Sequence, residues 1–200
     1  MEDSISLGWN CESASMGVEL GIRTKKQNGY NTCPFDECIT NYKGIVLCID
    51  EDFKYFCDIN YLTLIPAKFS TGGIVKDELL IYNTRYNFIF NHESPDHANL
   101  HIVQNWVGGK NHYIDNNYLL FIERYTRRIN NFRYYINNNY KIKFIIGKFD
   151  NDYSELNETI HRKYPNLNFD ILSYIPASVT LNVFKEHHLL MEESKSELEK

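Results

Sequence analysis

The pattern that most restricts the fold is a strand, helix and strand in succession near the C-terminal end. The apolar run at residues 141–147 predicts a strand, residues 153–164 predict a helix, and residues 169–174 predict a second strand. Two strands joined by a helical crossover pair in parallel, because the helix carries the chain back to the same end of the sheet. The sequence therefore predicts an α/β fold with a mixed or mostly parallel sheet flanked by helices.

Other periodic segments add elements to this sheet. Short β-prone runs at residues 62–65, 79–82 and 88–90 predict further strands, and a run at residues 179–184 predicts another. Residues 35–56 have an approximately helical apolar spacing that begins at Pro34, with a break expected at residues 50–52. A long amphipathic helix is expected where apolar residues alternate in steps of four and three, at Tyr118, Ile122, Tyr125, Ile129, Phe132 and Ile136.

The size and composition indicate a single domain. With 200 residues and 43% hydrophobic content, the chain can fill one sizeable core, and we expect one domain over residues 1–186 and a charged tail over residues 187–200. The net charge of −5 gives no reason to expect nucleic-acid binding. No apolar stretch is long enough for a membrane helix, and the N-terminus lacks the features of a secretory signal. Five cysteines, an odd number, favour reduced thiols and a cytoplasmic location.

Cys11 is the first candidate for chemistry. A predicted strand at residues 4–7 ends at Gly8, and helical spacing of small residues begins at Cys11. A thiol at a helix N-terminus is favoured as a thiolate by the free backbone N–H groups and the helix dipole. Asn10 and the backbone N–H of Cys11 could donate to an oxyanion. The alternative is that Cys11 is a small buried residue at a strand-to-helix junction.

A histidine that could act as the base lies after the strand at residues 88–90. His92 follows this strand directly, in a polar turn where an imidazole could accept the thiol proton. It could equally be a structural histidine that stabilises the loop. The competing histidines are His97 and His101, and the candidates for a third residue that orients the imidazole are Asp96, Asn105 and Asp36.

The helix at residues 118–136 also carries a basic and aromatic cluster. Arginines at 124, 127, 128 and 133 are interleaved with tyrosines, and the plain interpretation is a solvated face beside the core. The functional interpretation is that one arginine turns inward and binds a substrate carboxylate or phosphate. The histidines and cysteines lack the close pairs typical of zinc sites, so we expect neither a metal nor another cofactor.

Several segments together resemble a known family. The matching segments are Ser6-Leu7-Gly8-Trp9-Asn10-Cys11, Gly21-Ile22-Arg23, Pro34-Phe35-Asp36, Asp52-Phe53 and Arg127-Arg128-Ile129-Asn130-Asn131-Phe132. In this order they resemble the family of putative papain-like cysteine peptidases, which occurs in bacteria and in large DNA viruses. One departure is Glu37 after Asp36, where the family often has an aromatic residue.

The resemblance implies a cysteine-dependent hydrolase, either a peptidase or a related acyl-transfer enzyme. It implies Cys11 as the nucleophile and His92 as the base, and Asn10 is the expected oxyanion donor. Arg23, Asp36 and Arg128 are candidate substrate-binding residues for a protein or peptide substrate. Two alternatives remain: an inactive interaction module with the same fold, and a nucleotide-sugar transferase that would use Asp150 and Asp152. The oligomeric state is not predicted.

Overall fold

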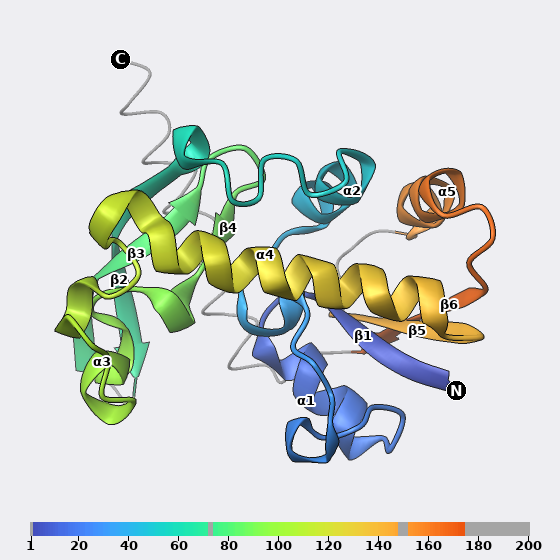
Figure 1. The fold of residues 1–200 in the computed structure, drawn as a ribbon, viewed down its shortest axis with the longest axis horizontal. Coiled ribbons are helices and arrows are strands. Elements are labelled where there is room, and N and C mark those ends of the chain that lie inside the picture. The colour runs from blue at the N-terminus through green and yellow to red at the C-terminus, as the bar shows by residue number, and fades with distance from the viewer. Residues whose placement is uncertain (1, 72–73, 148–151, 175–200) are drawn as a thin grey trace.

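The protein contains two small sheets with helices packed around them (Figure 1). We analysed a computed structural model, which describes residues 2–71, 74–147 and 152–174. One sheet is parallel and the other antiparallel, so the α/β class is confirmed and the two kinds of pairing occur in separate sheets. The expected strand at residues 179–184 and the expected tail at 187–200 lie outside the described residues, and the division into one domain and a tail stays a prediction.

The parallel sheet has the order β1-β5-β6, in which β1 spans Glu2–Gly8, β5 spans Lys141–Gly147 and β6 spans Phe169–Tyr174. The β-α-β prediction is confirmed, because β5 and β6 are parallel and joined by α5 (Ser154–Lys163). β1 pairs with β5 from Glu2↔Lys141 onward, which places both ends of the described chain in one sheet.

The antiparallel sheet has the order β2-β3-β4. β2 (Leu62–Thr71) and β3 (Ile74–Asn83) form a long hairpin, and β4 (Phe88–Ile89) adds a short third strand. The three predicted strands in this region are confirmed. Among them β4 matters most for the site, because a short 3-10 helix, Asn91–Glu93, follows it directly and carries His92.

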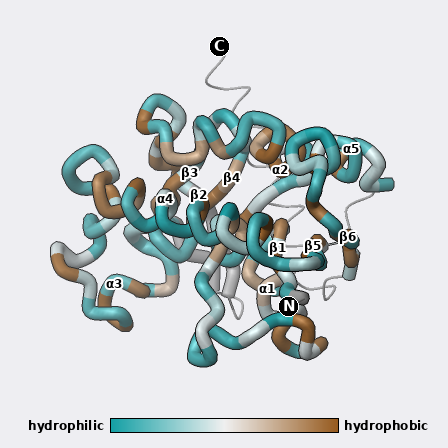
Figure 2. Tube along the Cα trace, turned by 45° about the vertical axis from the view of Figure 1, so that its right-hand side comes forward, coloured by the Kyte–Doolittle hydropathy of each residue, from teal (hydrophilic) through white to brown (hydrophobic). Residues whose placement is uncertain are grey.

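The remaining helices are α1 (Cys11–Glu19), α2 (Tyr42–Asp50), α3 (Leu100–Val103) and α4 (Asp115–Asn138). α4 crosses both sheets (Figure 1), and its trace alternates between hydrophobic and hydrophilic residues (Figure 2). Its apolar face contacts both parts: Phe132 stacks on Phe144 of β5 at 6.2 Å, and Tyr125 meets Phe90 at 4.9 Å between ring centroids. The long amphipathic helix is therefore confirmed, and it ties the two sheets into one aromatic core.

The helix expected over residues 35–56 is wrong in its first part. Residues Pro34–Glu37 form only a short 3-10 helix, and α2 begins at Tyr42 after the side chain of Asn41 accepts a hydrogen bond from the Gly44 N–H at 2.8 Å. Between them Ile39 exchanges two backbone hydrogen bonds with Ile89 of β4, at 2.8 and 3.0 Å. This distant pairing holds the segment extended. The end of the helix at Asp50 agrees with the predicted break, but the helix does not resume after it, because residues 51–56 form turns.

Candidate functional site

Cys11 is the first residue of α1 and follows the carboxyl end of β1, at the edge of the sheet where the parallel strands end. Gly8 ends the strand with φ of +103°, and a Cβ there would lie 1.9 Å from the Thr40 hydroxyl oxygen, so the turn needs glycine on both counts. The Asn10 side chain caps α1 by accepting from the Glu12 N–H at 2.8 Å. The predicted strand-to-helix position of Cys11 is confirmed.

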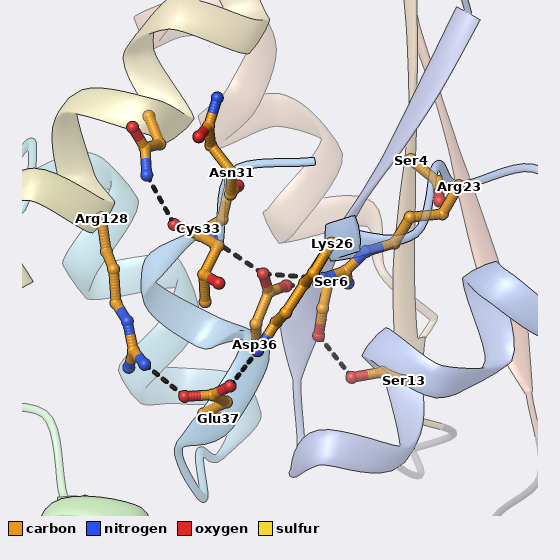
Figure 3. A network of polar contacts seen from close by, with 12 residues as sticks. Ser4, Ser6, Ser13, Arg23, Lys26, Asn31, Cys33, Asp36, Glu37 and Arg128 are labelled. Carbon is orange, nitrogen blue, oxygen red and sulfur yellow. Dashed lines mark hydrogen bonds and ion pairs between the residues drawn. The ribbon is translucent and has the colours of Figure 1, made fainter. Parts of the chain in front are cut away.

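Close packing fixes α1 against the sheet. The Ser13 hydroxyl donates to the Asn10 carbonyl at 2.9 Å and also hydrogen bonds to the Ser6 hydroxyl of β1, as Figure 3 shows. A Cβ at Gly17 would lie 2.8 Å from Ile145 Cδ1 of β5, which indicates that α1 lies directly on the sheet. The backbone that carries Cys11 is therefore held from both β1 and β5.

Cys11 is exposed, whereas Cys33, Cys38 and Cys48 are buried and Cys57 is half-buried. It opens into a cavity of about 430 Å³. His92 lines the same cavity, so the structure brings the two residues of the predicted pair to one place. No hydrogen bond joins their side chains in the part of the chain that the structure describes. The cavity is lined by Cys11, Ala14, Ser15, Val18, Glu19, Arg23, Thr24, Lys25, Lys26, Asp36, Glu37 and His92.

The electrostatics favour a neutral pair. Burial, together with the carboxylates of Glu12 and Glu37, raises the pKa of the Cys11 thiol, although its own backbone N–H and Lys26 lower it. Burial lowers the pKa of His92, and the carboxylates of Glu93 and Glu37 only partly offset this. The helix N-terminus therefore does not make Cys11 a thiolate at neutral pH. An uncharged imidazole facing a thiol can act as a general base during attack.

His92 is bordered by a second histidine that is itself firmly held. The rings of His92 and His97 meet edge to face with centroids 6.1 Å apart. His97 Nδ1 lies 2.7 Å from a carboxylate oxygen of the buried Glu78, and its Nε2 lies 3.3 Å from the Asn91 amide nitrogen. These two contacts fit the tautomer that donates from Nδ1 to Glu78 and accepts at Nε2.

The expected orienting residues are engaged elsewhere or show no described contact with His92. Asp36 forms a buried ion pair with Arg23, and Asp96 faces Lys110 at 3.8 Å. Asn105 lies beyond α3 with φ of +52°, and no described hydrogen bond joins its side chain to His92. His101 lies in α3 and does not line the cavity.

Arg23 and Asp36, two of the expected substrate-binding residues, bind each other. Both guanidinium NH₂ groups of Arg23 donate to the Asp36 carboxylate at 2.9 Å, and the backbone N–H of Cys33 adds a bond of 2.7 Å. Arg23 also lies 3.8 Å from the centre of the Tyr30 ring. The pair lines the cavity, but its charged groups already have partners, so its evident role is to fix the cavity wall.

Arg128, the third expected substrate-binding residue, turns inward, and its partners there are carboxylates of the protein. It binds Glu37 and lies 3.2 Å from Glu93, which is fully buried. Arg124 also reaches both carboxylates, and the Tyr125 hydroxyl donates to Glu93 at 2.9 Å. Glu93 follows His92 directly, so this network fastens the histidine segment to α4.

Glu37 connects this network to the Cys11 cavity. Figure 3 shows it between Lys26 and Arg128, and it binds both. Burial by itself raises the pKa of Glu37, but Arg128, Lys26 and Arg124 outweigh burial and lower the pKa to about 2. The sequence marked Glu37 only as a departure from the family pattern and indicated no role for Lys26 or Glu93. Arg124, a partner of Glu93, lies 31 positions away in the chain.

The remaining predictions concern Asn10, a metal site, the aspartates at 150 and 152, and a membrane helix. Asn10 uses its side-chain oxygen as the cap of α1, and it does not line the cavity. Within residues 2–71, 74–147 and 152–174, no three histidine, cysteine or acidic side chains gather as metal ligands. Asp150 is outside the described residues, and Asp152 accepts from Ser154 at the start of α5. No helix in these ranges has the length and apolar character needed to cross a membrane.

Comparison with known proteins identifies the class of this fold and site. A family model described as putative papain-like cysteine peptidase matches residues 2–181. The chain belongs to this family, and the resemblance seen in its motifs is confirmed. No curated protein and no solved structure gives a significant match.

Proposed function

We propose that the protein is a cysteine-dependent hydrolase or acyl-transfer enzyme in which Cys11 is the nucleophile and His92 the general base. The observation that carries this proposal is that the one exposed cysteine of the described chain begins a helix and shares a cavity with His92. Family membership supports the same chemistry. The substrate would be a peptide, an isopeptide, or another amide or thioester.

The reaction begins from the neutral pair. Cys11 Sγ attacks the substrate carbonyl while His92 takes the thiol proton, and the carbonyl electrons move onto the oxygen. The backbone N–H of Cys11 can donate to that oxygen, because the first N–H groups of a helix have no carbonyl partner within it. The Glu12 N–H is not available, since the Asn10 side chain already accepts from it. His92 then gives its proton to the leaving amine or thiolate as the bond to carbon breaks. Water, deprotonated by His92, releases the acyl group and restores the thiol.

His97 and Glu78 would position the base in this scheme. The buried Glu78 carboxylate holds His97, and the His97 ring borders His92. The His92 ring is therefore oriented by packing against His97. This differs from an arrangement in which a carboxylate hydrogen bonds directly to the imidazole of the base. His97 is therefore a positioning residue in the proposal.

The test uses p-nitrophenyl acetate with the wild type, Cys11→Ala and His92→Ala. We expect a burst of nitrophenolate and an acetyl group on Cys11 by peptide mass spectrometry, followed by turnover. Cys11→Ala should lose both. His92→Ala should acylate slowly and then keep the acetyl group, because water is no longer activated. His161→Ala, which alters an exposed histidine on α5, is the matched control. Equal acetylation of Cys11 and Cys57, with no effect of His92→Ala, would refute the proposal and favour an interaction module.

A further inference from the structure

A second cavity adjoins the Cys11 cavity on the side of α4. It has a volume of about 280 Å³ and shares Lys26 and Glu37 with the Cys11 cavity. Three arginines of α4 form one wall, and the segment before Pro34 forms the other. The cavity is lined by Lys26, Tyr30, Asn31, Thr32, Glu37, Arg124, Arg127, Arg128 and Asn131. An acyl substrate bound at Cys11 could therefore extend into it.

The charges in this second cavity do not balance. Four cations, Lys26, Arg124, Arg127 and Arg128, line it, and the carboxylates that bind them are Glu37 and Glu93. The surplus is two positive charges in a protein whose net charge is −5. The low pKa of Glu37, about 2, reports the same field, because even a largely buried carboxylate stays ionised there.

Arg127 is the one cation of this cavity to which the described residues supply no ion-pair partner. It is exposed, and no carboxylate of the described chain forms an ion pair with it, whereas Arg128 is buried and Arg124 is held by Glu93. The Asn131 amide nitrogen is used by the Thr32 carbonyl at 2.9 Å, which keeps the two walls in place. The cavity thus combines a fixed wall with one free guanidinium and the exposed Lys26 ammonium.

We propose that this cavity is a specificity subsite that receives an anionic group of the substrate, either a side-chain carboxylate or a phosphate. The inference rests on the proposed function, because it assigns the substrate class of the same site. Arg127 and Lys26 would bind the anion directly, and Glu37 would hold Lys26 and Arg128 so that their positions do not depend on the ligand. The expected substrates are acidic or phosphorylated peptides.

The binding test uses Cys11→Ala, so that no reaction occurs. The probes are N-acetylglutamate methylamide, its glutamine isostere and N-acetylphosphoserine methylamide, titrated while the arginine Nε–Hε signals are followed by NMR. We expect the glutamate probe to bind roughly threefold to fivefold more tightly than the glutamine probe, the upper part of the range for one partly exposed ion pair. A larger gain for phosphoserine would identify phosphate as the preferred anion.

A second substitution assigns the effect to this cavity. Arg127→Gln should bring the acidic and neutral probes within twofold of one another. Arg133→Gln is the matched control, because Arg133 lies on the same helix but pairs with Asp52 and lines neither cavity. Equal binding of the glutamate and glutamine probes, or an acid preference that survives Arg127→Gln, would overturn the proposal. These results do not depend on Cys11 chemistry, so this proposal and the proposed function fail separately.

The link to the nucleophile has its own test in the wild type. The p-nitrophenyl ester of N-acetylglutamate should acylate Cys11 faster than the ester of N-acetylglutamine, through a lower KM. Arg127→Gln should remove this difference, whereas Arg133→Gln should keep both the difference and the rate with p-nitrophenyl acetate. Anion binding without any ester preference would show that the cavity is not a substrate subsite.

Discussion

Replacing Glu37 with glutamine should destabilise the protein by an amount that depends on pH. Glutamine keeps the shape and lacks the charge, so it resembles the protonated carboxyl group. The folded protein lowers the pKa of Glu37 from 4.5 to about 2, and its side chain is only 17% exposed. At about 1.4 kcal/mol per pKa unit, the ionised form contributes about 3 kcal/mol to the free energy of unfolding at pH 7.

The sign of the pH dependence follows from the direction of this shift. A carboxyl group whose pKa is lowered by folding contributes stability above its unfolded pKa, and the contribution is lost as pH falls toward the folded pKa. The difference between wild type and Glu37→Gln should therefore be full above pH 5. It should fall below half, to roughly 1.4 kcal/mol, at pH 3. Urea unfolding followed by circular dichroism at both pH values gives the two differences.

Glu51→Gln is the matched control. Glu51 also binds an arginine, Arg85, but that arginine is 38% exposed and is the only cation among the described residues that forms an ion pair with Glu51. We expect this control to cost less than about 1 kcal/mol, as exposed ion pairs usually do. A loss below about 1 kcal/mol for Glu37→Gln at pH 7, or a loss that is the same at pH 3, would refute the electrostatic account of the Glu37 network.

Three further substitutions test the framework of the site by urea unfolding. Gly8→Ala should lower the free energy of unfolding by about 2–4 kcal/mol, because it combines a positive φ with a clash against Thr40. The double variant with Thr40→Ala should recover part of this loss only if the clash contributes. Asn10→Ala should cost about 1 kcal/mol through loss of the helix cap, and a neutral result would exclude that role. Arg23→Met should cost about 3–5 kcal/mol because Asp36 stays buried without its partner, and Arg23→Met with Asp36→Leu should cost less than Arg23→Met alone.

The sequence predicted those parts of the fold in which local pattern and tertiary environment agree. The bounds expected for residues 141–147 and 169–174 coincide with β5 and β6. β5 is mostly buried, as expected for a central parallel strand that is largely apolar, whereas β6 lies at the edge of the sheet and keeps exposed residues. α4 was equally clear from its apolar stripe. The helix predicted over residues 38–41 does not form, because Ile39 pairs with the distant Ile89, and spacing within the segment carries no sign of that pairing.

The sequence predicted a residue of the site only where the segment around that residue indicates its position. Cys11 could be placed because a turn glycine and helical spacing surround it, and His92 because it follows a strand. The partners of Arg128 could not be found, because Glu37 lies 91 positions away in the chain. The thiolate expected at Cys11 rested on the helix N-terminus alone, and desolvation by the surrounding protein, together with the carboxylates of Glu12 and Glu37, raises the pKa of the thiol instead.

The pairing of β1 with β5 has a consequence for how the protein is made. Glu2 pairs with Lys141, so the strand that precedes Cys11 leaves the ribosome long before the strand that holds it. At typical synthesis rates of 5–20 residues per second the delay is roughly 7 to 30 s. During this time α1, which begins at Cys11, lacks the strand against which Gly17 packs. Pairing over such a separation also makes folding slow, so nascent chains should complete the sheet beneath Cys11 only after β5 has been made.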